Sequence, residues 1–566
     1  MQYYEEYNIK KYDNIGILNK IENDFYVNNQ IIENNRAIIN DIVYILDYKI
    51  IGIKEKNKNN IVGILYIDSK IKYGSIKDKS LYLFKPSDKR YPNFYVPYKK
   101  TILLNKIYII IQFKKWDITD KLPIGTLIEN IGIVGDKEVE YEHLRTYYNI
   151  KNNIWKVDNN KKINDTAILD ELELLNEDYK VFSIDPEGSK DIDDAFHFNI
   201  LGNKDYEVGI HIASPTKFFG DNLKDVLNRV STVYTPTRKY NMLPNIYSDD
   251  LISLLENKKR HALSLIITFD KDFNIISENI KETIVKNIKN FNYHEFDEVY
   301  KNNKNLEEFV VFTNNFFKEN EINSHKLVEN WMIYTNKYVA DYLIKKDLSN
   351  LILRKHEFSD FNLDNKNLNN DLMKYLKNRN QNSALYEIYD KELNQKHHQI
   401  GNTYYTHMTS PIRRSVDFFI HLLIIENKNI MEKEELNKYI EKINIFTKNS
   451  RKFGRNTKRL EFLYNVKKLD ENIETYCYII SISSSKITVF IPEYNLEEKI
   501  IIIPYKFNNI STVNLNKDEH DIIHSIDYNI DNIYKYYSLY QRINIKLWIF
   551  TSFENIFDKL KIEILY

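Results

Sequence analysis

The stretch SIDPEGSKDIDDA, residues 183–195, decides how the rest of this 566-residue chain is interpreted. It holds four aspartates, Asp185, Asp191, Asp193 and Asp194, between the strand-like runs VFSI and AFHF. Carboxylates this close together raise one another's pKa unless a positive charge compensates them. A hard divalent cation, Mg²⁺ or alternatively Mn²⁺, prefers such oxygen ligands. Adjacent residues of a regular strand point to opposite faces, so Asp193 and Asp194 need a turn or a bulge to approach one ion.

Two other interpretations of this stretch compete with a metal site. An Asp-rich segment is often a solvated turn, although Ile184, Ile192 and Ala195 place apolar side chains among the acids here. A calcium-binding EF-hand loop requires Glu at its twelfth position. Counted from Asp185, that position is Phe196, so the EF-hand pattern fails.

A second segment, YTHMTSPIRRSVD at residues 405–417, leads into an apolar run that predicts a helix. Pro411 is typical of the first turn of a helix, where free N–H groups favour anions. Arg413 and Arg414 add guanidinium groups, which bind phosphate through paired hydrogen bonds. The segment therefore predicts a phosphate-binding corner, and an ordinary helix cap with exposed basic residues is the alternative.

The composition narrows the class of protein. Aromatic residues make up 14% of the chain, too many for a mainly disordered protein. The single cysteine, Cys477, cannot form an intrachain disulfide and favours a reducing, intracellular compartment. Lys+Arg and Asp+Glu number 80 each, which argues against a general electrostatic coat for DNA but permits a local basic channel. Apolar runs such as residues 107–111 are too short to span a membrane.

The residue pattern predicts a multidomain α+β protein. Short β-branched and aromatic runs up to about residue 150 predict two small β-barrels. Residues 180–270 alternate predicted strands and loops. Helical spacing follows between about residues 305 and 347, and again at 416–430 and 434–468. In the first of these stretches one face carries Leu327, Trp331, Tyr334, Tyr338 and Tyr342. After Glu474 the period returns to that of strands, which predicts a closing β-barrel.

Together, the two segments resemble the signature motifs of the RNase II/RNase R (RNB) family of processive exoribonucleases. Residues 184–195 match its I-D-P-x-x-x-x-D-I-D-D-A loop, and residues 407–417 resemble its H-F-T-S-P-I-R-R-Y-x-D segment. Further similar stretches are VGIHIASPTKFF (208–219), NRVSTVYTPTRKYNMLP (228–244), LVENWMIYTNKYVADYL (327–343) and LILRKHE (351–357). Upstream, residues 34–45 and 128–150 resemble cold-shock-like domains, the latter most closely those of the eukaryotic, exosome-catalytic branch.

The resemblance implies the domain order. It predicts a first cold-shock-like OB domain at 1–70, a second at 71–160, a mixed α/β RNB catalytic domain at 161–470 and a C-terminal OB-fold RNA-binding barrel at 471–566. Because the chain starts close to the first barrel, we expect no N-terminal PIN endonuclease domain.

The resemblance also implies residue roles. Asp185, Asp191, Asp193 and Asp194 match the acidic residues that hold Mg²⁺ and activate water, and Asp193 matches the one tied most directly to catalysis. Tyr234 matches a tyrosine that packs against the 3′-terminal nucleotide, although a lone Tyr in a strand is more often a core residue. Arg413 matches the arginine on the scissile phosphate, and Arg414 is expected to bind a neighbouring phosphate. His211 and His421 are expected to be structural.

A late basic helix carries Arg451, Lys452, Arg455, Lys458 and Arg459, which form either a solvated face or the wall of an RNA channel. We expect Arg451, Arg455 and Lys458 to contact RNA. Glu461 follows, and its alignment with a family glutamate is left open.

Three positions depart from the family pattern. Ser214 stands where the family usually has Asp, and Met408 and Ser415 replace aromatic residues. None of these substitutions removes a predicted metal ligand.

The resemblance implies a Mg²⁺-dependent, processive 3′-to-5′ exoribonuclease with a two-metal mechanism. It would act on single-stranded RNA with a free 3′ end, release nucleoside 5′-monophosphates, and be a cytoplasmic monomer without a membrane partner. The alternatives are a catalytically silent RNA-binding regulator of the same family, a subunit docked on an exosome-like complex, and a nuclease acting on DNA. The presence of all four aspartates argues against the silent regulator.

Overall fold

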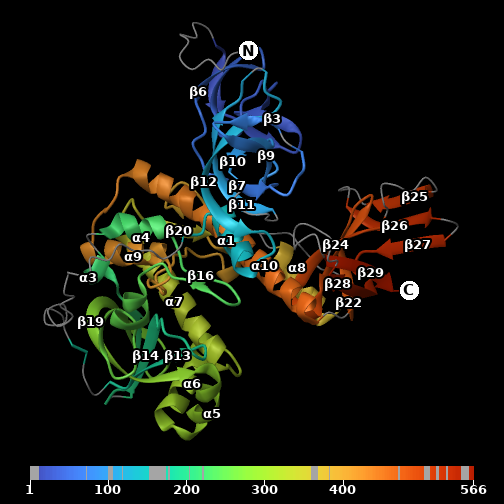
Figure 1. Cartoon of the computed structure of the whole chain (residues 1–566). Coiled ribbons are helices and arrows are strands. Elements are labelled where there is room, and N and C mark those ends of the chain that lie inside the picture. Colours follow the sequence, from blue (N-terminus) through green and yellow to red (C-terminus); the bar gives the residue numbers. More distant parts are fainter. Residues whose placement is uncertain are drawn as a thin grey trace. The chain divides into compact units, whose positions relative to one another are not determined.

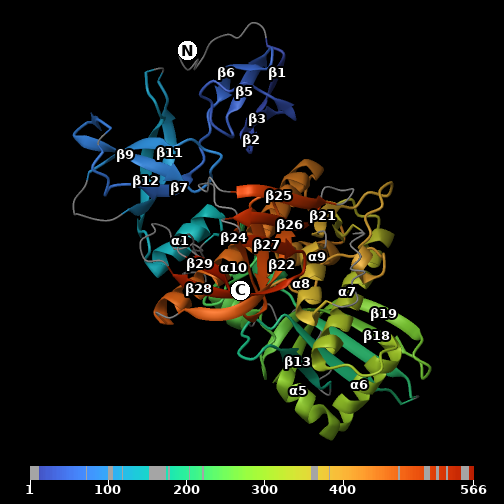
Figure 2. The same cartoon turned by 90° about the vertical axis from the view of Figure 1, so that its right-hand side faces the viewer.

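The computed structural model describes residues 12–71, 73–99, 106–117, 119–151, 174–175, 179–202, 204–219, 222–357, 368–380, 383–469, 472–502, 510–517, 522–530, 533–549 and 560–565. The chain divides into two compact units (Figures 1 and 2). One unit combines Met1–Ile150 with Arg455–Tyr566, and the other is Lys151–Gly454. Each unit is described by itself.

The first part of the N-terminal segment is built from short antiparallel strands. Strands β1 (Asn14–Ile17), β5 (Ile42–Leu46) and β6 (Lys49–Glu55) form one sheet, and β2 (Asn19–Ile21), β3 (Asp24–Val27) and β4 (Gln30–Ile31) form another. Buried and half-buried residues alternate along β5, as expected for a strand with one face on a core. That core contains Leu18, Val27, Val43 and Ile45.

A six-stranded sheet follows, with the order β10-β12-β11-β7-β9-β8. Its strands are β7 (Ile61–Leu65), β8 (Ser75–Ile76), β9 (Lys79–Pro86), β10 (Phe94–Tyr98), β11 (Ile107–Lys115) and β12 (Ile124–Ile133). The β-branched run of β11 is buried from Ile107 to Ile111, which explains its continuous apolar character. Helix α1 (Lys137–Tyr147) comes next, and the Asp136 side chain caps it by accepting a hydrogen bond from the Val139 N–H.

The C-terminal segment of the same unit returns to strands, as predicted. Strands β22 (Ile473–Ile482), β23 (Lys486–Ile491), β24 (Leu496–Ile501), β28 (Arg542–Ile549) and β29 (Leu560–Leu565) form a sheet with the order β24-β23-β22-β28-β29. Strands β25 (Ile510–Lys517), β26 (Ile523–Ile530) and β27 (Ile533–Ser538) form a second sheet, and a 3₁₀ turn η5 covers Pro492–Tyr494. The single cysteine, Cys477, is buried in β22.

The second unit contains a closed barrel of five strands. Its members are β13 (Val181–Asp185), β14 (Asp194–Ile200), β15 (Tyr206–Ala213), β18 (Lys259–Phe269) and β19 (Ile275–Asn292). Successive strands pair antiparallel, and a parallel pairing of β13 with β19 closes the barrel. Sequence analysis predicted strands and loops here but no barrel, because the closing pair joins Val181 to Asn287, far apart in sequence.

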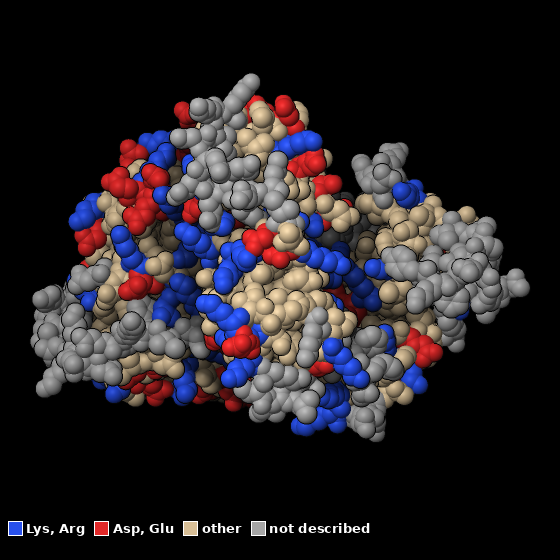
Figure 3. All heavy atoms as spheres, turned by 45° about the horizontal axis from the view of Figure 1, so that its top comes forward, with Lys and Arg blue, Asp and Glu red and all other residues tan. Residues whose placement is uncertain are grey.

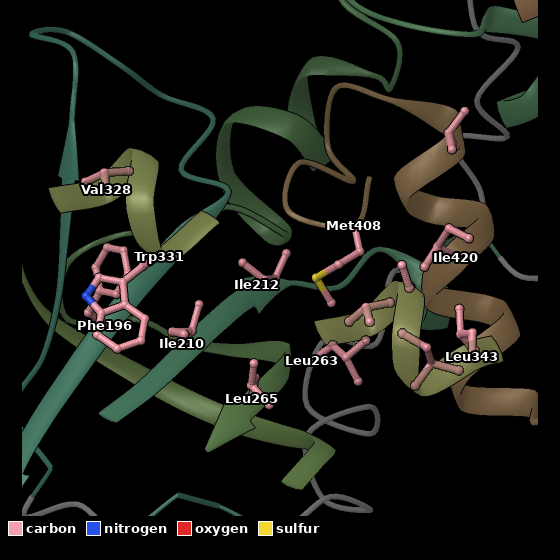
Figure 4. Close-up of a cluster of buried hydrophobic side chains, with 14 of the residues drawn as sticks. Phe196, Ile210, Ile212, Leu263, Leu265, Val328, Trp331, Leu343, Met408 and Ile420 are labelled. Carbon is pink, nitrogen blue, oxygen red and sulfur yellow. The ribbon is translucent and has the colours of Figure 1, made fainter. Parts of the chain in front are cut away.

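Helices α5 (Tyr293–Val299), α6 (Lys304–Phe317) and α7 (Ser324–Lys345) pack against this barrel, with a 3₁₀ turn η3 at Tyr300–Asn302. The helical spacing predicted between about residues 305 and 347 is confirmed as the two helices α6 and α7, and the apolar face of α7 meets the barrel core. Figure 4 shows Trp331 and Val328 beside Phe196 and Ile210 of the barrel. The Trp331 indole N–H also donates a hydrogen bond to Thr313 Oγ1 of α6 at 3.2 Å.

Helix α9 (Ser415–Glu426) lies in the interior of the second unit, and its residues from Ser415 to Ile424 are buried. Helix α10 (Lys433–Leu469) follows; both helices were predicted. The other helical elements are α3 (Thr216–Phe219), α4 (Leu223–Arg229), the π-turn η2 (Tyr247–Leu251), α8 (Asn370–Asn380) and η4 (His398–Ile400). Two two-stranded sheets complete the unit: the hairpin of β16 (Val233–Tyr234) and β17 (Lys239–Tyr240), and the pair of β20 (Ile352–Lys355) with β21 (Leu385–Ile388).

The structure also bears on the expected lack of a membrane-spanning segment and on the balance of acidic and basic residues. Within the described residues, no helix is both long enough and apolar enough to cross a membrane. Acidic and basic side chains are interspersed on the face shown in Figure 3, in keeping with the formal net charge of +0. The predicted domain limits stay predictions, and those at residues 160 and 470 lie outside the described residues.

Candidate active site

A cavity of about 750 Å³ lies within the second unit. The predicted residues that line it are Asp185, Asp191, Asp193, Asp194, Tyr234, Arg413 and Arg414. They come from the acidic loop, the β16–β17 hairpin and the segment that precedes α9. The fold therefore brings together the acidic and basic motifs that lie more than two hundred residues apart in sequence.

The acidic loop is shaped by the barrel strands on either side of it. Strand β13 ends at Asp185 and β14 begins at Asp194, so Asp193 lies in the irregular segment between them. The backbone N–H of Ile192 donates to Ser253 Oγ at 2.9 Å, and the Ser253 hydroxyl donates to the Lys190 carbonyl at 2.7 Å. This irregular approach lets Asp193 and Asp194 both face the cavity, as the sequence required.

Asp193 has a hydrogen-bond partner on each of its two carboxylate oxygens. Its Oδ2 accepts a hydrogen bond from Arg413 Nε at 2.8 Å, and its Oδ1 accepts one from the Ile412 N–H at 3.1 Å. Asp193 is only 3% exposed. Burial outweighs the attraction of Arg413 and raises the pKa of Asp193 to about 6.

In the absence of a cation, ionisation of Asp185 and Asp194 is unfavourable. Burial and the neighbouring carboxylates raise the pKa of Asp185 to about 7. The same two causes raise the pKa of Asp194 well above its usual range. Asp185 Oδ2 is buried and has no hydrogen-bond partner. An unpartnered buried carboxylate oxygen next to other acids is a costly arrangement that a bound cation relieves.

Asp191 is held from the β16–β17 hairpin. The Tyr234 hydroxyl donates to Asp191 Oδ2 at 2.8 Å, and Lys239 Nζ lies 2.7 Å from Asp191 Oδ1. The Tyr234 ring is half exposed. Burial and the nearby Asp191 raise the pKa of the Tyr234 hydroxyl, so it stays a hydrogen-bond donor at neutral pH.

The arginine segment is tied to the same hairpin. The Thr232 N–H donates to the Arg413 carbonyl at 2.9 Å, and the Ser415 N–H donates to the Val230 carbonyl at 2.8 Å. Arg414 Nη2 pairs with the buried Asp417 at 2.8 Å. These bonds fix the relative positions of Tyr234 and Arg413, which the sequence places 179 residues apart.

The donor set suits a hard divalent cation, because it consists of clustered carboxylate oxygens with one buried oxygen unpartnered. Within the described residues, however, no group of three or more His, Cys, Asp or Glu side chains is already arranged around one metal position. Arg413 and Lys239 lie against Asp193 and Asp191 instead. Metal ligation by the four aspartates therefore stays a prediction.

The other predicted residues are not among those that line this cavity. Arg451, Arg455 and Lys458 are on α10 and do not line it, and the Arg451 guanidinium donates to Ser383 Oγ at 2.6 Å. Their RNA contacts stay predictions. The Glu461 carboxylate accepts hydrogen bonds from Lys137 Nζ at 2.8 Å and the Tyr141 hydroxyl at 2.6 Å.

The two histidines expected to be structural are fully buried. His211 Nδ1 is hydrogen bonded to Ser264 Oγ at 2.7 Å inside the barrel. His421 Nε2 donates to the Met408 carbonyl at 2.8 Å, and its Nδ1 lies 3.4 Å from the hydroxyl of Ser214, one of the departures from the family pattern.

The other two departures are also accommodated. Met408 is buried in the core cluster (Figure 4). Ser415 Oγ is hydrogen bonded at 2.6 Å to the hydroxyl of Tyr439, whose ring from α10 packs near Phe419.

Sequence reasoning missed several residues that line the cavity, among them Tyr293, Glu329, Asn336, His397 and His407. Glu329 was within reach, because it is an acid in the otherwise largely apolar stretch LVENWM. Nothing in the sequence pattern marks Lys239, whose importance depends on its ion pair with Asp191.

Parts of the chain match known protein domains, and much of it is similar to curated proteins. Residues 175–315 and 306–430 match the RNB domain, and residues 81–149 match the Dis3-like cold-shock domain 2 (CSD2). The mouse exosome complex exonuclease RRP44 is 24% identical over 546 residues, which cover 79% of this chain and 55% of that protein. The chain spans about half the length of the curated relatives it matches.

Solved structures share the architecture along nearly the whole chain. RNase R of Mycoplasma genitalium, solved with ribose-methylated single-stranded RNA, has a TM-score of 0.74 at 18% identity, covering 98% of this chain and 100% of that one. Yeast Ssd1, described as a pseudonuclease, has a TM-score of 0.73 at 15% identity, covering 98% of this chain and 96% of that one. At these identities the likeness concerns the fold alone, and it confirms the predicted fold class.

Proposed function

The chain belongs to the RNB family, and on that premise we propose that it is a processive 3′-to-5′ exoribonuclease. In this proposal it hydrolyses single-stranded RNA to nucleoside 5′-monophosphates by a two-metal mechanism, with Mg²⁺ as cofactor and Mn²⁺ as an alternative. The observation that carries the proposal is the cavity in which four carboxylates, Tyr234 and Arg413 converge.

The chain's own residues supply binding and orientation. The Arg413 side chain is 42% exposed on the cavity side while its Nε is held by Asp193. Its guanidinium can therefore bind an RNA phosphate in a fixed position, where a permanent positive charge stabilises the negative charge of the transition state. The half-exposed Tyr234 ring offers a surface on which the terminal nucleotide can stack.

Asp185, Asp191, Asp193 and Asp194 would hold the divalent cations in this cavity. Bound there, such ions would supply a lowered pKa for the attacking water and charge stabilisation for the leaving 3′-oxygen. The raised pKa values of Asp185 and Asp194 support this assignment, because clustered acids that are costly to ionise alone gain most from a cation.

A catalytically silent RNA-binding protein is the second candidate. The observation in its favour is the similarity in fold to Ssd1, a pseudonuclease. Since an active ribonuclease and a pseudonuclease share this fold, architecture does not separate the two functions. The four aspartates in one cavity favour the enzyme.

The test is a time course on 5′-labelled single-stranded RNA with Mg²⁺. We expect full-length RNA to disappear into a short end product with few intermediates, and EDTA to abolish this. Asp193→Asn should lower the rate about a hundredfold or more, because each 1.36 kcal/mol lost in the transition state costs a factor of ten. Asp272→Asn, at an exposed position of the second unit, is the matched control and should degrade RNA normally.

RNA that stays intact but shifts in a native gel would support the silent regulator. A parallel DNA substrate tests the choice of nucleic acid, and we propose that DNA is not degraded. We further propose that the protein is a cytoplasmic monomer. We also propose that it can associate with an exosome-like complex, and co-purification with the ring subunits would test that association.

A further inference from the structure

Lys239 places an ammonium group beside Asp191, one of the carboxylates that line the cavity. Its Nζ lies 2.7 Å from Asp191 Oδ1, and the side chains of Lys239 and Asp191 are 27% and 12% exposed. In the β16–β17 hairpin Lys239 pairs directly with Tyr234, whose hydroxyl donates to the other Asp191 oxygen. One hairpin therefore holds both oxygens of a predicted metal ligand.

The chain thus places a cation of its own on two of the four carboxylates, Lys239 on Asp191 and Arg413 on Asp193. With all four acids ionised, the two cations leave two net negative charges in the cluster. One divalent ion balances that charge. A second divalent ion at Asp191 would have to share a small, half-buried region with the Lys239 ammonium, and the two would repel strongly.

A second acceptor for Lys239 is already within reach. Asp249, in the π-turn η2, has its Oδ1 3.6 Å from Lys239 Nζ. The Ser248 hydroxyl holds that Asp249 oxygen at 2.7 Å. A small change of Lys239 rotamer would exchange Asp191 for Asp249 without leaving the ammonium unpaired.

We propose that Lys239 is a positioning residue that takes the place of a second divalent cation at Asp191 in the RNA-free protein, and that it passes to Asp249 when that cation enters. The RNA phosphate brings the negative charge that the second ion requires, so this ion is expected to enter together with the substrate. The proposal rests on the cation-dependent function proposed above.

The experiment measures Mn²⁺ binding to the full-length, RNA-free protein, with free Mn²⁺ followed by electron paramagnetic resonance. Wild type should bind one ion tightly and a second weakly. Lys239→Met should tighten the second site about five- to tenfold, because a competing unit charge near the ion is removed. Lys239→Arg keeps the charge and should bind no tighter than wild type. Lys190→Met, an exposed lysine beside Asp191 in sequence, is the matched control and should change the affinity less than about twofold.

Asp249→Asn should change the affinity in the opposite direction, because Lys239 loses its second acceptor and stays on Asp191. If Asp249 acts through Lys239, this loss should vanish in the Lys239→Met background, which a double-mutant cycle measures. Should Lys239→Met fail to fold, as judged by circular dichroism in EDTA, Asp249→Asn and Lys239→Arg still decide the matter.

Unchanged or weaker Mn²⁺ binding in Lys239→Met would overturn the proposal, since it would make Lys239 an ordinary orienting partner of Asp191. That result would leave the exoribonuclease standing, because wild-type RNA degradation tests it separately. Tighter Mn²⁺ binding in Lys239→Met would support the proposed role of Lys239. If the wild type nevertheless failed to degrade RNA, the proposed exoribonuclease function would be rejected.

Discussion

At the scale of single residues, burial fixes the charge state of His421. The imidazole is fully buried in α9 between the Met408 carbonyl and the Ser214 hydroxyl. Two titratable groups on neighbouring strands that interact with it, His261 and Glu282, pair with each other at 2.9 Å. Burial lowers the pKa of His421 to about 4, so the folded protein holds this residue neutral where the unfolded chain would protonate it.

This shift predicts an acid-sensitive contribution to stability. A histidine with a lowered folded pKa contributes stability above its unfolded pKa of about 6.5, and the contribution is lost as pH falls toward 4. At pH 5 the loss should amount to about 2 kcal/mol. His421→Gln should shrink the difference between urea unfolding at pH 7 and at pH 5 by that amount.

The control for this measurement is His294→Gln, because the His294 side chain is 84% exposed. Its effect on the pH dependence should be negligible. An unchanged pH dependence in His421→Gln would mean that other buried groups dominate acid unfolding.

How far single residues could be predicted depends on whether their role is local. The four aspartates and Arg413 stand in dense motifs, so their presence in one cavity was predictable, and the structure brings them together. Lys239 acts through Asp191, a partner on another segment, and no spacing in the sequence marks it. The role of Ser415 depends on its hydrogen bond with Tyr439 of another helix, which the sequence does not reveal.

At the scale of elements, the closed barrel of the second unit contains a line of polar side chains. His197 Nδ1 meets His211 Nε2 at 2.8 Å, and His211 Nδ1 meets Ser264 Oγ at 2.7 Å. The outer end of the line is Glu207 Oε1, 3.2 Å from His197 Nε2. Strand β15 makes room for the His197 ring by having Gly209 directly opposite it.

Gly209→Ala should therefore destabilise the barrel. A Cβ at Gly209 would lie 2.1 Å from the nearest atom of the His197 ring, which is held by hydrogen bonds on both sides. Overpacking of this kind costs about 1–3 kcal/mol. Gly202→Ala, where a Cβ would meet nothing within 4 Å, is the matched control and should stay within about 0.5 kcal/mol of wild type. Equal melting temperatures for the two variants would show that His197 can move aside.

Helices were more predictable than barrel closure. The apolar spacing of residues 324–345 identifies α7 because helical contacts are local in sequence. The parallel pairing of β13 with β19 depends on residues about a hundred positions apart, and a strand pattern carries no information about its partner. The same limit explains why the sequence predicts strands near residues 180–270 without predicting their barrel.

At the scale of the whole molecule, the chain has separate cores in its two compact units. The barrel and helices of Lys151–Gly454 share one set of buried side chains, whereas β7, β9, β10 and β11 enclose another. All the aspartates of the candidate active site belong to the Lys151–Gly454 unit. Ligand binding stabilises the unit that contains the site, because only its native state has the site.

Divalent cations should consequently protect the two units unequally against hydrogen exchange. At a Mg²⁺ concentration of about a hundred times the Kd, binding adds about 2.7 kcal/mol, so amides of the Lys151–Gly454 unit that exchange through its full unfolding should slow about a hundredfold. Peptides from β13, β14 and α9 report this effect, and peptides from β7 and β11 serve as the internal reference. Asp193→Asn should reduce the protection in the first group. Equal slowing in both groups would place the main cation site outside the acidic cluster, because only a ligand shared by both units, or a general salt effect, protects them alike.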